Sequence, residues 1–168
     1  MSQIRTDSIS LEKLGSDYKV TVSYTVLFNP TEVRLDIPFV VTGELGLRLR
    51  PFGVEGPWFG KVPEWVVAPE GESERTSSFE VVLSCNDVAS ELLGNVRANR
   101  NQISGTERDF YNLVTELEAA SESELQQPAP LSTVLQKYGM SAFVHVHFNV
   151  NMVVGGCNGD DERAADAL

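Results

Sequence analysis

The sequence has little of what nucleic-acid binding, metal clusters and disulfide-stapled folds require. Only 13 of the 168 residues are lysine or arginine, against 24 acidic residues, and the formal net charge is −11. Such a charge repels phosphate groups, so nucleic acid and anionic membranes are not expected as partners. The two cysteines are too few for a disulfide framework, which favours free thiols.

Long apolar runs are also absent. The first eight residues have no apolar core of the kind an export signal carries, and no window approaches the roughly 18 apolar residues of a membrane span. We therefore expect a soluble protein, with the cytoplasm as its default location. The length and composition suit one ordinary globular unit. We expect a single β-rich domain over residues 1–154, followed by an acidic tail over 155–168 with little to bury.

Alternation of apolar and polar residues is the strongest structural signal. Residues 18–28 alternate strictly, and residues 142–154 form the longest alternating run. The alternation shifts phase over residues 33–41, which predicts a hairpin with 18–28 through a turn at 29–32. Beyond Gly43 the pattern continues, either in one long bent strand or in a second strand after a three-residue loop.

The middle of the chain is less regular. Residues 51–63 are rich in proline and glycine and are predicted to form a loop. A second hairpin is predicted between 65–67 and 79–85, across the polar turn 69–78. Residues 87–98 fit either a short helix or a strand.

Two helices are predicted late in the chain. Thr106 and Asp109 resemble a capping box, and apolar residues follow at helical spacing, which predicts a helix over 106–121. Leu131 to Tyr138 recur helically between two prolines and Gly139, which predicts a second helix.

These elements predict a mainly β fold. The expected architecture is an antiparallel two-sheet sandwich with a helical segment at about 106–139, because strands joined by hairpins lack the alternation of strand and helix that builds parallel sheets. One antiparallel sheet backed by helices is the alternative.

His145 and His147 are the only histidines and share one face of the predicted strand. The spacing from Gly139 to His-x-His resembles the opening of the first cupin motif. Asn151 and Met152 stand where a cupin has its glutamate ligand, so the family is not assigned. A divalent transition metal would need a third ligand from elsewhere. Otherwise this polar face is exposed or covered by another subunit.

Four aromatic residues form the other candidate site. They lie within 14 residues and could line a groove for a peptide, a sugar or a small apolar ligand, or form a lid over the core: Phe52, Trp58, Phe59 and Trp65.

Catalytic and cofactor motifs are missing from the sequence. It contains no Gly-x-Ser-x-Gly elbow, no phosphate-binding Gly-Lys-Ser/Thr and no Rossmann glycine pattern. We therefore expect no cofactor, and a non-catalytic binding or assembly module that recognises a protein partner or small ligand through loops and a β surface. The alternatives are a metal-binding protein or metal-dependent enzyme centred on the two histidines, and a structural oligomer subunit.

Overall fold

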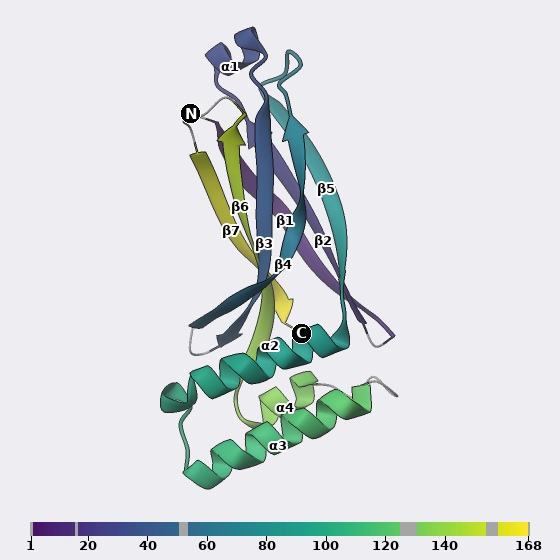
Figure 1. The fold of residues 1–168 in the computed structure, drawn as a ribbon, viewed down its shortest axis with the longest axis vertical. Helices are drawn as coiled ribbons and strands as arrows, with labels where there is room; N and C mark the ends of the chain where they lie inside the picture. Colours follow the sequence, from purple (N-terminus) through teal and green to yellow (C-terminus); the bar gives the residue numbers. More distant parts are fainter. Residues whose placement is uncertain (1, 16, 51–53, 125–130, 154–157, 168) are drawn as a thin grey trace.

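The computed structural model describes the backbone of residues 2–15, 17–50, 54–124, 131–153 and 158–167, and their side chains except in 54–63, 121–124 and 158–167. Two antiparallel sheets face each other, and helices lie at both ends of the sandwich (Figure 1). The predicted two-sheet, mainly β architecture is therefore confirmed.

The two sheets differ in size. Sheet A has three strands in the order β1-β2-β5, namely β1 (Gln3–Leu14), β2 (Asp17–Leu27) and β5 (Glu74–Leu83). Sheet B has four strands in the order β4-β3-β6-β7, namely β4 (Val54–Val67), β3 (Phe39–Arg50), β6 (Ser141–Met152) and β7 (Asn158–Ala167).

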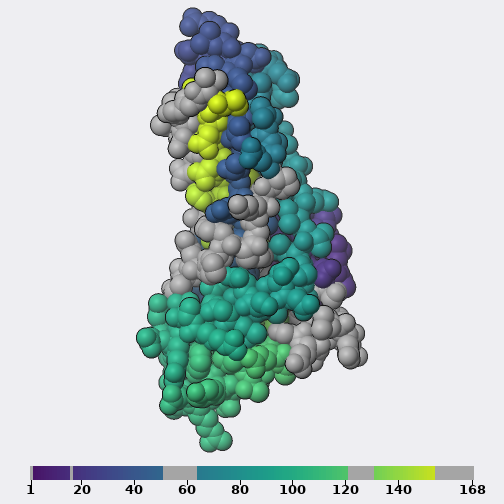
Figure 2. Space-filling model, in the orientation of Figure 1, coloured from purple at the N-terminus to yellow at the C-terminus, as the bar shows by residue number. Residues whose placement is uncertain are grey.

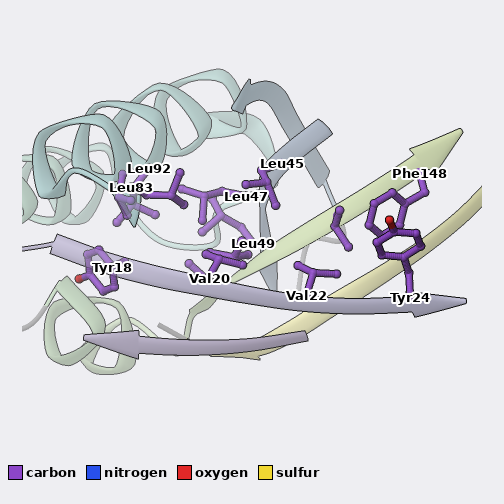
Figure 3. Packing of buried hydrophobic residues seen from close by; sticks show 14 of the residues in the cluster. Tyr18, Val20, Val22, Tyr24, Leu45, Leu47, Leu49, Leu83, Leu92 and Phe148 are labelled. Carbon is purple, nitrogen blue, oxygen red and sulfur yellow. The ribbon is translucent and has the colours of Figure 1, made fainter. Parts of the chain in front are cut away.

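The inner faces of β2 and β6 form the centre of the core, as their alternation predicts. The even-numbered residues of both strands are buried because period-two side chains all point between the sheets. Figure 3 shows Tyr24 of β2 against Phe148 of β6. The rings of Tyr24 and Phe148 lie 5.2 Å apart, centroid to centroid. The same figure shows Leu47 of β3 with Leu92 toward the helices. The buried inward residues of β2 and β6 are Tyr18, Val20, Val22, Tyr24, Val26, Ala142, Val144, Val146, Phe148 and Val150.

The predicted hairpin between residues 18–28 and 33–41 is wrong. Residues Pro30–Leu35 form helix α1, which leads from sheet A to sheet B. The Asn29 side chain accepts hydrogen bonds from the Thr31 and Glu32 amides, and the Glu32 carboxylate accepts one from the Asn29 amide. This capping box fixes a helix where the proline suggested only a turn.

Residues 39–50 form one continuous strand, which settles the alternatives at Gly43. β3 pairs with β6 without a register shift. Its other neighbour, β4, occupies most of the predicted loop 51–63, so that prediction is also wrong. The β3–β4 ladder has three register shifts, the first between Val41 and Gly43. Such bulges accommodate proline and glycine in a strand and break the alternation that the sequence would show.

The predicted second hairpin is wrong in its pairing. Residues 65–67 belong to β4 in sheet B, whereas β5 pairs antiparallel with β2 in sheet A. The polar turn between them therefore carries the chain from one sheet to the other. A strand pattern gives the facing of each strand but does not specify its partner.

Three helices close one end of the sandwich (Figure 1). α2 (Cys85–Ala98) shows that the ambiguous segment 87–98 is helical. α3 (Glu107–Glu124) and α4 (Leu131–Lys137) confirm the two predicted helices. At the start of α3, the Thr106 amide donates to the Asp109 carboxylate and the Asp109 amide to the Thr106 hydroxyl, as the capping box predicts.

The two ends of the chain contain strands that the sequence pattern did not reveal. β1 is an edge strand with a bulge between Thr6 and Ser8, and this bulge breaks its alternation. The acidic segment expected as a tail contains β7, which pairs with β6 through its backbone. β1 and β7 pack against each other and close one side of the sandwich.

The facing of β6 predicts a contrast in stability. Phe148→Ala removes a fully buried ring and should lower the free energy of unfolding by about 3–5 kcal/mol. Asn149→Ser changes a partly exposed side chain on the other face and should change it by less than about 0.5 kcal/mol. Chemical denaturation measures both, and equal costs would contradict the assigned facing.

Candidate functional site

A pocket opens on the side of the sandwich where β4 of sheet B approaches β5 of sheet A. Its volume is about 180 Å³. We call it the seam pocket, because it lies along the open seam between the two sheets. The residues that line it come from β2, β4 and β5, and are Tyr24, Trp65, Val66, Val67, Arg75, Thr76 and Ser77.

Aromatic rings form the inner wall of the seam pocket. The Trp65 ring lies 4.8 Å from the Tyr24 ring and 5.7 Å from the Phe79 ring, centroid to centroid. Phe79 in turn meets the buried Phe148 ring edge to face, at 5.9 Å. Such pairs are worth about 0.5–1.5 kcal/mol each beyond the area that they bury. The wall is therefore continuous with the core and is held rigidly.

Two polar atoms in this wall are buried and make no hydrogen bond of normal geometry within the described residues. They are the Tyr24 hydroxyl and the Trp65 indole N–H. Tyr24 is only 1% exposed. Burial raises the pKa of the Tyr24 phenol, and hydrogen bonding of less favourable geometry with the Ser77 and Trp65 side chains offsets part of this rise. Because buried polar groups normally have partners, these two atoms are suited to a bound acceptor.

The outer rim of the seam pocket is polar. Arg75 donates to the Glu70 carboxylate at 2.5 Å, so the positive charge beside the pocket is already paired. The Thr76 hydroxyl is 2.8 Å from that of Thr25, which fixes this part of β5 on β2. The pocket thus combines aromatic walls with neutral hydrogen-bond donors, and its one cation is neutralised. No nucleophile paired with a base lies among its lining residues.

Only one of the four predicted aromatic residues can be placed in this pocket. Trp65 lines it and also packs on the core. Phe52 lies outside the described residues, and the side chains of Trp58 and Phe59 are not among those described. The backbone register places Trp58 opposite Gly46, and Gly46 opposite His145. One residue of each predicted site, Trp58 and His145, therefore lies in the same backbone row of sheet B.

The two histidines have different environments. His145 is fully buried, so the prediction that its face is wet or covered by another subunit is wrong at this position. His147 is partly exposed, as are Asn149 and Asn151. The register places Glu44 of β3 and Glu162 of β7 directly opposite His147. Within the described residues, no group of three or more histidine, cysteine or acidic side chains could hold a metal ion.

Sequence reasoning missed most of the seam pocket. Tyr24 looked like one more inward residue of an alternating strand, and Arg75 to Ser77 looked like part of a turn. Their contribution depends on the pairing of β5 with β2 and on the approach of β4 from the other sheet. The one available signal was the tyrosine at an inward position, because a buried phenol needs a hydrogen-bond partner.

Comparisons with known proteins give no function. No protein-family model and no curated protein matches the chain. Among solved structures, a protein from Archaeoglobus fulgidus aligns over 98% of this chain and 100% of its own, with 12% identity and a TM-score of 0.39. A putative β-galactosidase from Bacteroides fragilis aligns over 97% of this chain, with 10% identity and a TM-score of 0.39. The chain spans 15% of that protein. None of the helices in the described segments has the length and apolarity to cross a membrane.

The buried Tyr24 hydroxyl predicts an unusual response to substitution and pH. Tyr24→Phe should change the free energy of unfolding by less than about 1 kcal/mol at pH 7, because the lost hydroxyl makes no hydrogen bond of normal geometry within the described residues. The pKa of this phenol is higher in the folded protein than in the unfolded chain. The folded state is therefore favoured while the phenol is protonated, and it loses this contribution as the pH rises from the unfolded-state pKa through the folded-state pKa.

Denaturation measured from pH 8 to 11.5 tests this prediction. The wild-type protein should lose stability more steeply above about pH 10 than Tyr24→Phe, because only the wild type carries this phenol. Tyr111→Phe, at a 62% exposed tyrosine, is the matched control and should behave as the wild type. A large loss of stability in Tyr24→Phe at pH 7 would show that the hydroxyl has an internal partner.

Proposed function

We propose that the chain is a non-catalytic binding module whose seam pocket takes a small, neutral, ring-sized ligand with a hydrogen-bond acceptor. One observation carries the proposal: the buried Tyr24 hydroxyl and Trp65 indole N–H line the same pocket, and neither makes a hydrogen bond of normal geometry within the described residues. A buried polar group without a partner costs about 1–3 kcal/mol, and a ligand acceptor would recover that cost.

Size and charge narrow the ligand further. An engineered apolar cavity of roughly 150 Å³ binds benzene, so a pocket of about 180 Å³ suits a single ring with a small substituent. Arg75 is paired with Glu70, and Glu64, Glu72 and Glu74 are exposed nearby, so an anion gains little here. Small apolar or sugar rings that carry a carbonyl or hydroxyl group fit these conditions.

Binding of simple probes tests the proposal. Acetophenone has a ring and an acceptor, ethylbenzene has the ring alone, benzoate adds a charge, and glucose represents a sugar ring. Their binding can be followed through the indole N–H signal of Trp65 in nuclear magnetic resonance spectra, with Trp58→Phe used for assignment. We expect acetophenone or glucose to shift this signal, and benzoate to bind less well.

Tyr24→Phe is the decisive variant because it removes one donor and keeps the ring. It should weaken binding of the acceptor-bearing probe by roughly 2- to 10-fold, which is the value of one hydrogen bond, and leave ethylbenzene unchanged. Thr133→Ser in α4, at the other end of the sandwich and outside the pocket lining, is the control. The proposal fails if no probe shifts the Trp65 signal, or if Tyr24→Phe binds every probe as the wild type does.

A metal site at His147 is a second candidate function. It is supported by the backbone register, which places Glu44 of β3 directly opposite this histidine of β6. Histidine with carboxylates suits zinc and related ions. Zinc binding measured by calorimetry on tag-free protein should then be lost in His147→Ala and retained in Asn151→Ala. Absence of stoichiometric zinc binding in the wild type would remove this candidate.

A further inference from the structure

The two sides of the sandwich are closed differently. On one side β1 packs along β7, whereas on the other side β4 and β5 approach each other at few positions in the described part of the chain. Sheet A has one strand fewer than sheet B. Because β1 lies against β7, the three strands of sheet A leave β4, at the far edge of sheet B, without a strand opposite it. A fourth strand of sheet A would lie beside β5 and face β4.

The outer edge of β5 offers ten residues of backbone for pairing. Its inner edge pairs with β2 from Tyr18↔Leu83 to Leu27↔Glu74, and in the described residues no strand pairs with the outer edge. An edge strand directs alternate N–H and C=O groups away from the sheet. Figure 2 shows β5 at the molecular surface along one side of the sandwich.

The side chains of β5 also leave apolar surface uncovered. Phe79 and Val81 point inward yet are only partly buried, although the β2 residues opposite them are completely buried. Val82 is 59% exposed on the outward face, and Val66 of β4 is 64% exposed beside the seam. A strand added to β5 would cover the inward pair and the mouth of the seam pocket.

β5 has few of the features that usually protect an edge strand from pairing. Proteins block such edges with proline, charged side chains or bulges. β5 contains no proline or lysine, its ladder with β2 has no register shift, and its charged residues lie toward its two ends, with Glu74 and Arg75 at the start and Glu80 near the end. The other strand at the seam, β4, contains Pro57 and Pro63 and has three register shifts against β3. The available edge is therefore that of β5.

Charge identifies the kind of partner. Residues 64–83 contain five glutamates and one arginine, with no lysine or aspartate. Glu70 pairs with Arg75 and Glu80 with Lys19 of β2, so five glutamates against these two cations leave a net charge of −3 at this edge. The chain as a whole carries −11, so a second copy is repelled. A basic segment would be attracted, and complementary charge raises the rate of association.

We propose that β5 binds an extended, basic segment of a partner protein by strand addition. Backbone hydrogen bonds along Glu74–Leu83 supply the affinity, and the inward side chains of the added strand supply the specificity by packing on Phe79, Val81 and the pocket mouth. This surface lies beyond the small-ligand function of the seam pocket and does not depend on it.

The probe for this proposal is a blocked eight-residue peptide of alternating lysine and valine. Binding to the full chain is measured by calorimetry, and the protection of β5 amides from hydrogen exchange is measured with and without peptide. We expect binding together with new protection confined to β5. A peptide N-methylated at every second residue keeps the charge but cannot form the ladder, and it should bind at least tenfold more weakly.

Charge-reversal variants separate this edge from general attraction. Glu64→Lys with Glu74→Lys should weaken peptide binding by on the order of tenfold. Glu12→Lys, an equally exposed change on β1 at the opposite edge of sheet A, should not. Equal binding of the N-methylated peptide, or protection of amides outside β5, would overturn the proposal. Protection of β5 that rises with protein concentration alone would instead assign the edge to a second copy of this chain.

Discussion

The contact between the inner faces of β2 and β6 is the interaction on which the rest of the structure depends. Each strand contributes an unbroken row of buried residues, and the rows meet through the ring contact of Tyr24 with Phe148. Sheet A is assembled around β2, which lies between β1 and β5, and sheet B around β3 and β6. The aromatic wall of the seam pocket is an extension of this contact, so the pocket inherits the rigidity of the core.

Unequal strand numbers explain why the open side lies at β5. Helices close the ends of the sandwich, and β1 with β7 closes one side, but three strands cannot cover four. The apolar area left uncovered at β4 and β5 is reduced by Trp65 of β4, whose ring contacts the Tyr24 and Phe79 rings of sheet A. The Trp65 side chain thus covers part of the apolar surface that a further strand of sheet A would cover. Its indole N–H is buried in the process, and this leaves the polar atom that the proposed ligand would satisfy.

The polar groups at the seam suit the proposed recognition of a neutral ligand. The Tyr24 phenol is protonated at neutral pH, since the ordinary pKa of tyrosine is about 10 and burial raises it further, and Arg75 is paired with Glu70. The polar row through His147 lies on the other face of sheet B, since β6 directs its odd-numbered residues away from the core. The proposed ligand site at the seam and the proposed metal site at that row can therefore be tested by separate substitutions.

The sequence by itself determined the class of fold and the facing of its regular strands. Periodicity of two placed the inward rows of β2 and β6, and helical spacing with a Thr106 cap placed α3, because these patterns depend on neighbours along the chain. The sequence patterns did not reveal α1, β4 or the two terminal strands. At α1 the residues of the capping box resembled a turn. In β1 and β4 bulges or an edge position removed the alternation.

Only the tertiary structure decided which strands pair and where the seam pocket lies. Facing depends on local period, but pairing depends on contacts between residues far apart in sequence, such as Tyr24 with Ser77 and Val41 with Trp65. The seam pocket joins three strands from two sheets, so no local pattern could mark it. The burial of His145 was hidden for the same reason: its place on the polar face followed from the strand period, whereas its coverage depended on how the rest of the chain packs around it.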